Sequence, residues 1–213
     1  MKTTASNPAR ITVNPLVNLR RGGITAPLLL VALIASVIAF LVVKPDSEKS
    51  QVRLRLIPVA MGIFNVLNGV YTCRKAKSGD VNPGVVLQEN PMLIGVLADM
   101  NKGGGDTEWF ALKIQQEKVY GPDGIPLKVG TLIGTACEYG DSKDSESKGR
   151  WGYFAPTPIN HYTTDAAVMD RALATLSEDA WAMLEDAVQA IPDRRPGVYF
   201  LELTEESGLT PSA

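Results

Sequence analysis

The chain has 213 residues, of which 45% are hydrophobic and 21% are charged, and this composition excludes a disordered protein. The net charge is −2, yet every charged side chain before position 24 is basic. The acidic character of the rest of the chain argues against nucleic-acid binding, which requires a positive surface.

Residues 1–23 form a basic tail that precedes a long apolar run. The tail contains Lys2, Arg10, Arg20 and Arg21, and its short polar sequence with two prolines predicts a segment that is mobile by itself. The run from 24 to 43 has 20 residues and no charge. As a helix it would be about 30 Å long, which matches the hydrocarbon core of a bilayer.

We therefore expect a single N-terminal transmembrane helix at 24–43. A cleaved signal peptide has a shorter apolar region and small residues at its cleavage site, and a soluble helix is rarely apolar on every face. The predicted anchoring residues are Ile24, Leu28, Leu33, Phe40 and Val43. The predicted contacts with anionic lipid headgroups are Arg20, Arg21 and Lys44. The acid-free tail favours a single pass with the tail inside and the C-terminal body on the outer or periplasmic face.

The basic segment 44–80 allows two alternatives. Residues 56–72 are apolar enough for a second, short membrane segment, although Asn65 and Asn68 would need partners in lipid. Alternation from Val52 onward and the Asn68–Gly69 pair instead favour a β-hairpin.

Residues 81–213 are predicted to form an acidic α+β domain outside the membrane, with both β-sheet and helix. Strands are expected at 85–87, 92–100, 108–115 and 125–139, with a tight turn at 121–124 and polar loops at 101–106 and 140–149. Two helices follow, capped by Thr164 and Ser177, and the second ends before Pro192. A last strand is expected at 197–203.

The sequence contains few signs of catalytic chemistry. It lacks a phosphate-binding GxxxxGK[ST] loop, an HExxH motif and a GxSxG motif, and its only histidine is His161. Without a CxxC or Cys/His cluster, neither a metal nor a cofactor is expected. Cys73 and Cys137 are either one disulfide or two free thiols. The carboxylates of Asp106 and Glu108, beside Trp109, leave a hydrolase possible.

Residues 150–162 concentrate aromatic side chains next to an arginine, a composition typical of contact surfaces. The candidates for partner contact are Arg150, Trp151, Tyr153, Phe154 and Tyr162; the alternative is that this loop packs its aromatic rings onto its own core. The leading hypothesis is a non-catalytic, membrane-anchored accessory subunit whose partners are other membrane protein subunits. A tethered carboxylate hydrolase and an exterior ligand-sensing domain are the alternatives.

Overall fold

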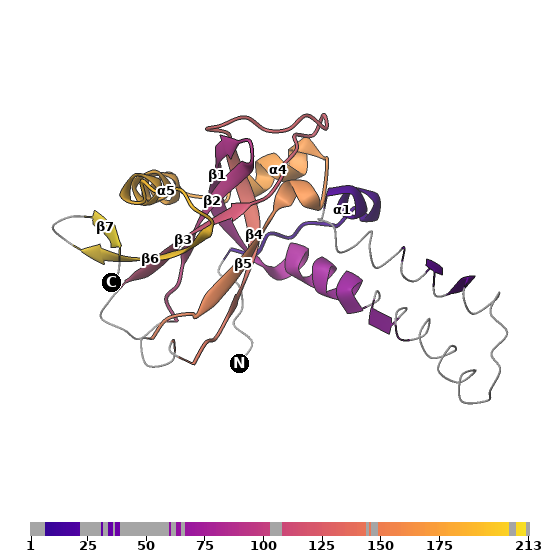
Figure 1. Cartoon of the computed structure of the whole chain (residues 1–213), viewed down its shortest axis with the longest axis horizontal. Coiled ribbons are helices and arrows are strands. Elements are labelled where there is room, and N and C mark those ends of the chain that lie inside the picture. Colours follow the sequence, from indigo (N-terminus) through magenta and orange to yellow (C-terminus); the bar gives the residue numbers. More distant parts are fainter. Residues whose placement is uncertain are drawn as a thin grey trace.

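The computed structural model describes residues 7–21, 31, 34, 35, 37, 38, 60, 63, 64, 67–102, 108–143, 145, 149–204 and 208–211. These residues form a mixed α+β domain built on a seven-stranded antiparallel sheet, as the sequence predicted for the body (Figure 1). The strand order is β5-β4-β1-β2-β3-β6-β7. The strands are β1 (Asp80–Glu89), β2 (Met92–Asp99), β3 (Trp109–Gln116), β4 (Leu132–Gly140), β5 (Tyr153–Pro158), β6 (Gly197–Thr204) and β7 (Gly208–Pro211).

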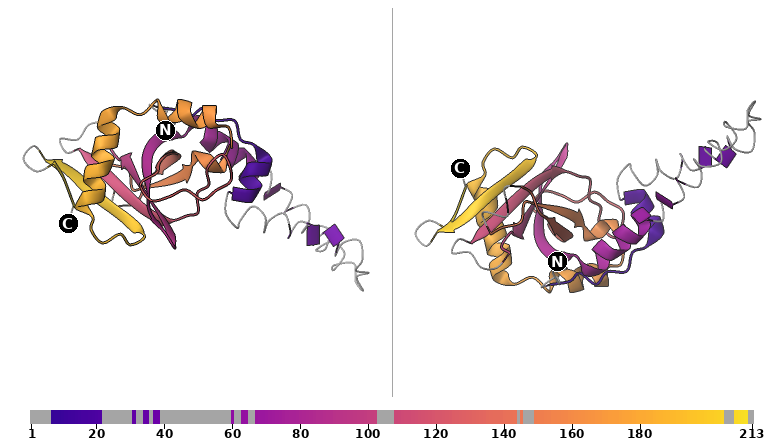
Figure 2. Two further views of the ribbon diagram at one scale, coloured as in Figure 1. Left: turned by 90° about the horizontal axis from the view of Figure 1, so that it is seen from above. Right: turned by 90° about the horizontal axis from the view of Figure 1, so that it is seen from below.

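Helices pack around this sheet. The labelled ones are α1 (Pro15–Arg21), the 3-10 turn η2 (Ile159–His161), α4 (Ala166–Leu173) and α5 (Glu178–Ala190). Residues 67–78 are also helical and lead directly into β1. Helix α5 lies across one face of the sheet, and Figure 2 shows the 67–78 helix leaving the body on the side away from α5.

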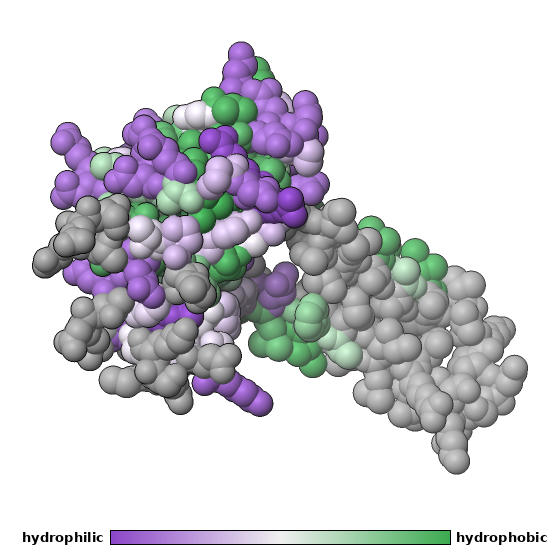
Figure 3. Space-filling model, turned by 60° about the vertical axis from the view of Figure 1, so that its left-hand side comes forward, coloured by the Kyte–Doolittle hydropathy of each residue, from purple (hydrophilic) through white to green (hydrophobic). Residues whose placement is uncertain are grey.

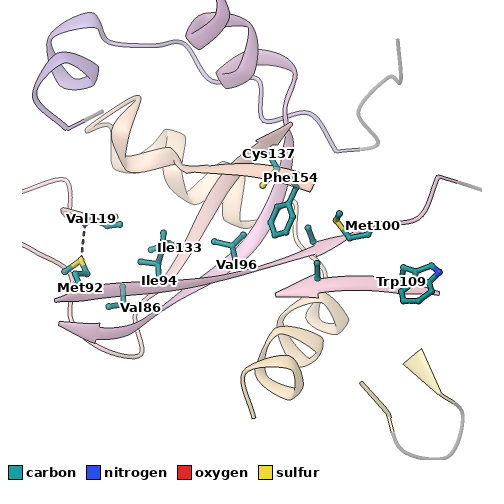
Figure 4. Packing of buried hydrophobic residues seen from close by; sticks show 12 residues of the cluster. Val86, Met92, Ile94, Val96, Met100, Trp109, Val119, Ile133, Cys137 and Phe154 are labelled. Carbon is teal, nitrogen blue, oxygen red and sulfur yellow. Dashed lines mark hydrogen bonds between the residues drawn. The ribbon is translucent and has the colours of Figure 1, made fainter. Parts of the chain in front are cut away.

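Side-chain alternation places apolar residues on both faces of the central strands. In β2, Met92, Ile94 and Val96 belong to the cluster drawn in Figure 4, which extends to Phe154 and Trp109. Leu93 and Leu97 point to the opposite face, where Leu184 and Ala187 of α5 cover them. Since a strand's side chains alternate between faces, both sides of this sheet exclude water.

Two local details differ from the sequence-based expectations. The N-cap of α4 is Asp165 and not Thr164, because the Asp165 carboxylate accepts hydrogen bonds from the Ala167 and Val168 amides. The sequence of residues 78–84, SGDVNPG, is typical of a turn, yet it contains the start of β1 at Asp80. Pro83 is tolerated there because β1 pairs at that point with β4, while its pairing with β2 begins only at Gly84. The Ser177 cap is confirmed.

The segment before β1 is helical where the structure describes it. Residues 60, 63, 64 and 67–78 have helical conformation, so the hairpin alternative with a turn at Asn68–Gly69 is wrong. The turn needs a left-handed backbone at both central residues, whereas helical hydrogen bonding continues from 67 to the end of this segment. No helix among the described residues combines the length and apolar character of a membrane crossing, and most of the run 24–43 lies outside those residues.

Candidate functional site

The N-terminal tail is fixed to the body over residues 7–14. The amides of Ala9, Arg10 and Ile11 donate to the carbonyl oxygens of Gly79, Lys77 and Ala76 at 2.9, 3.0 and 2.9 Å, respectively. The Val81 amide donates to the Asn7 carbonyl oxygen at 2.8 Å. The tail therefore lies along the end of the 67–78 helix and the start of β1, which hold a segment that is predicted to be mobile by itself.

Apolar packing reinforces this attachment. The Ile11 side chain is only 3% exposed and lies in a cluster with Ala76, Val81, Ile159, Tyr162 and Met169. On the other side of the tail, the Asn7 amide side chain donates to the Thr175 hydroxyl at 3.0 Å, after α4. The tail thus contacts elements that are separated from it by more than a hundred residues of sequence.

Helix α1 continues from this docked tail. Asn14 caps it by accepting a hydrogen bond from the Leu16 amide at 3.1 Å, and Pro15 occupies the first helical position, where it needs no donor. The backbone N–H of Asn14 donates to the Tyr162 carbonyl oxygen at 2.7 Å. Sequence therefore sets the helix start, and the body sets its position.

Arg20 and Arg21, two predicted headgroup contacts, lie at the end of α1. Arg20 is exposed. The Arg21 guanidinium lies 5.6 Å from the centroid of the Tyr120 ring and donates to the carbonyl oxygens of Tyr120 and Asn160 at 3.5 Å. Tyrosine side chains are enriched at membrane–water interfaces, and Lys and Arg are enriched in cytoplasmic segments next to membrane spans. The third predicted contact, Lys44, and all five predicted anchoring residues lie outside the described residues.

Exposed apolar side chains mark the helical residues that extend from the body. Ile63, Phe64, Leu67 and Val70 are each more than half exposed, and Val31, Ile34 and Ile38 before them are exposed as well. Figure 3 shows this hydrophobic surface where the described helical residues leave the body. We call Ile63, Phe64, Leu67 and Val70 the apolar stripe. Contiguous exposed apolar surface of this kind marks a site of contact with protein or lipid.

The C-terminal end of the 67–78 helix is inserted into the body. Lys75 is 6% exposed and Ala76 is fully buried. At Gly79 a Cβ atom would lie 2.6 Å from the Lys75 carbonyl oxygen and 2.8 Å from that of Cys137, so only glycine permits this approach to β4. One turn nearer the N-terminus of the helix, the Tyr71 hydroxyl hydrogen-bonds to Glu138 of β4. The helix is therefore held by the sheet along its last two turns.

Polar groups collect inside the sheet near this helix end. Burial lowers the pKa of the amines of Lys75 and Lys113 and raises the pKa of the Cys137 thiol to about 12. The Lys113 ammonium donates to the Phe154 carbonyl oxygen at 3.3 Å, and the Asn82 amide donates to the Tyr139 hydroxyl at 2.8 Å. These contacts satisfy polar groups within the core and join β1, β3, β4 and β5.

Most of the predicted partner contacts lie inside the domain. Phe154 and Tyr162 are each 1% exposed, and the Arg150 guanidinium stacks 3.6 Å from the centroid of the Phe200 ring. Their side chains therefore stabilise the core, which was the alternative interpretation of this loop. Tyr153 is 54% exposed on the edge strand β5, and Trp151 is half-buried, so these two remain accessible.

The other chemical candidates are dispersed. His161 is buried, with Nδ1 3.2 Å from a Glu117 carboxylate oxygen and Nε2 3.1 Å from the Lys118 carbonyl oxygen, so it links η2 to the end of β3. Cys73 is exposed and Cys137 is buried, and both are free thiols. Glu108 is exposed, and Asp106 lies outside the described residues.

Residues 74–191 match the family model described as "Protein of unknown function (DUF3239)". The match covers more than half of the chain. The chain belongs to this family. The family region starts at Arg74, at the foot of the helix, and ends at Ile191, just after α5, so it contains the body up to that helix and excludes the tail and both apolar runs.

Among solved structures, the chain is similar to the "Crystal structure of a putative membrane protein from Corynebacterium diphtheriae". The TM-score is 0.45 and the identity 22%, over 56% of this chain and 98% of that chain. Among curated proteins no sequence matches this chain.

Sequence reasoning missed the features that organise this site. The docked tail, the insertion of Lys75 and the Tyr120–Arg21 contact all join residues far apart along the chain. One local signal was available: the sequence Asn14–Pro15 before an apolar residue is a helix start.

Proposed function

We propose that this chain is a non-catalytic accessory subunit of a membrane protein complex, anchored in the bilayer through residues 24–43, with its body packed against partner subunits at the membrane surface. The observation that carries the proposal is the apolar stripe, which lies on helical residues just before the body. A large aliphatic or aromatic side chain gains about 1.5–3 kcal/mol on full burial, so covering this half-exposed stripe is worth on the order of 5 kcal/mol.

The surroundings of the stripe suit the boundary of a bilayer. Arg20 and Arg21 lie at the end of α1, directly before the apolar run, and Arg74 and Lys77 lie on the helix foot. Basic side chains at such positions attract anionic headgroups by about 1 kcal/mol each. The partner contact is proposed for the β5 edge, where Tyr153 is exposed and where large amphipathic rings are favoured at interfaces.

The test uses the full-length chain with a C-terminal tag. Membranes are washed with alkaline carbonate, solubilised in mild detergent, and the purified species is weighed by native mass spectrometry. We expect the chain to resist the wash and to emerge with a second polypeptide at fixed stoichiometry. Tyr153→Ala should reduce the recovery of that polypeptide, whereas Val198→Ala, an exposed apolar position on β6, should not.

Two results would overturn the proposal. Release of the intact chain by carbonate would remove the anchor. Recovery of the chain as a monomer, whose mass is 22.9 kDa plus the tag, or as a complex of identical copies, would remove the role of accessory subunit while the anchor stands.

A further inference from the structure

We infer that the chain crosses the membrane twice, through residues 24–43 and 56–72, and that the tail and the body share the cytoplasmic face. This inference rests on the membrane anchoring of the proposed function. It replaces the single crossing expected from the sequence with the alternative of a second membrane segment at 56–72, and it reverses the expected position of the body.

The docked tail is the decisive constraint. The tail precedes the first apolar run and the body follows the second, yet the two are joined by the Ala9, Arg10 and Ile11 hydrogen bonds and by the buried Ile11 side chain. Groups in such contact occupy one compartment. A chain that leaves this compartment after α1 must return before β1, so the number of crossings between them is even.

The second apolar run has the properties of the returning segment. Its 17 residues correspond to about 25 Å of helix, at the short end of the range for a crossing. Positions 60, 63, 64, 67, 70 and 71 are all helical and exposed, and their spacing of three and four residues places them on one face. By helical periodicity Asn65 falls on the opposite side of the helix, and Asn68, which is partly buried, falls at the border of this face. A neighbouring helix can supply hydrogen-bonding partners for both.

The structure also indicates where lipid would end. Tyr71 reaches Glu138 of β4, and four residues later Lys75 is buried in the body. At the end of α1, just before the first apolar run, Arg21 lies beside Tyr120. From the second run towards the body, the chain passes Tyr71 and then the basic residues Arg74 and Lys75. Next to the first run, the basic residues Arg20 and Arg21 follow directly, and the tyrosine beside them, Tyr120, comes from the body. Tyrosine and basic side chains are both favoured next to membrane spans.

The distribution of basic residues assigns that side to the cytoplasm. Seven basic residues flank the runs on the body side, and four lie in the connecting segment 44–55. The first set is Lys2, Arg10, Arg20, Arg21, Arg74, Lys75 and Lys77; the second is Lys44, Lys49, Arg53 and Arg55. With a single crossing, the four basic residues of the tail would face the four of the connecting segment across the bilayer. With two crossings, Arg74, Lys75 and Lys77 lie on the same side as the tail, which gives that side the excess. Cytoplasmic segments carry the excess of Lys and Arg.

Cysteine accessibility tests both parts of this inference. In a Cys73→Ser background the remaining thiol, Cys137, is buried and unreactive, which makes it an internal control. Single reporters are placed in the tail (Thr12→Cys), in the connecting segment (Ser50→Cys) and in the body (Gln189→Cys). Thr12 and Gln189 are exposed. A membrane-impermeant maleimide is applied to intact cells, to permeabilised cells and to inverted vesicles.

We expect only the Ser50→Cys variant to be labelled in intact cells, and the Thr12→Cys and Gln189→Cys variants to be labelled in inverted vesicles. Labelling of Thr12→Cys and Gln189→Cys from opposite faces would restore a single crossing and overturn the inference. Labelling of all three reporter cysteines only from the cytoplasmic face, in a chain that resists carbonate, would overturn the two crossings and leave the proposed membrane anchoring. The expected pattern with its faces exchanged would overturn the cytoplasmic position. Release by carbonate would overturn the anchor as well.

Discussion

The attachment of the tail can be tested at Ile11, whose side chain is 3% exposed in the cluster with Ala76 and Tyr162. Ile11→Ala removes buried methyl and methylene groups, and such substitutions cost about 2–5 kcal/mol. The backbone hydrogen bonds of the tail are retained, so the loss falls on the packing of the tail. A loss of about 2 kcal/mol would raise the population of the undocked tail roughly 30-fold, since each 1.4 kcal/mol is a factor of ten.

Limited trypsin digestion at Arg10 measures this population, because cleavage requires the tail to leave the body and follows the open fraction when reclosing is fast. The full-length protein in detergent is compared with Ile11→Ala, and each rate is divided by the rate measured in urea. Leu16→Ala is the matched control, because Leu16 is 68% exposed on α1 and its truncation should change stability by no more than about 0.5 kcal/mol. Equal cleavage rates for the two variants would refute the tail docking on which the two-crossing topology depends.

Three further predictions concern the body. Because burial lowers the pKa of Lys75, the unfolded chain binds more protons than the folded one as pH increases from 7 towards 10.5, and the free energy of unfolding of the wild type should rise relative to that of Lys75→Met. Lys77→Met, at an exposed position, is the control and should follow the wild type. The same pH dependence in urea melts of all three proteins would contradict this prediction. Iodoacetamide should modify one thiol, that of Cys73, in the native protein and both thiols in urea, because Cys137 is buried with a pKa of about 12. The mass of the intact protein gives the number of modified thiols. Two modified thiols in the native protein would show that β4 opens. Asp165→Ala should cost about 1 kcal/mol by thermal unfolding and Thr164→Ala less, and the reverse order would return the helix cap to Thr164.

The strands of the body were predictable where one period dominates the sequence. Phe110, Leu112 and Ile114 alternate with other residues along β3, and the expected strand coincides with the observed one to within a residue at each end. The α5 boundaries were also predicted, because Ser177 caps the start and Pro192 stops the helix. In these elements local sequence and tertiary burial favour the same conformation.

The errors fall where distant residues decide the structure. Asn68–Gly69 is a strong turn signal, yet the helix continues because its end is held by β4 through Lys75 and Gly79. For Phe154 and Tyr162 the sequence left partner contact and core packing open, and tertiary contacts decide between them: β5 pairs with β4 and turns Phe154 into the core, while Tyr162, directly after η2, packs in the cluster that contains Ile11 of the tail. Neither the pairing nor the tail contact leaves a trace in the local composition.

The same long-range contacts give the body a defined orientation. A body joined to its anchor by one flexible linker can rotate freely, and its partner surface then faces the membrane only part of the time. Here the chain enters the body through α1 and again through the 67–78 helix, and both are held against η2, β1 and β4. Two attachment points remove rotation about a single tether, and β5, which carries Tyr153, pairs with the strand that holds the helix foot. Fixing this edge beforehand lowers the entropy lost when a partner binds, which is a general route to higher affinity. The double attachment is therefore the property through which the anchor would support the accessory role.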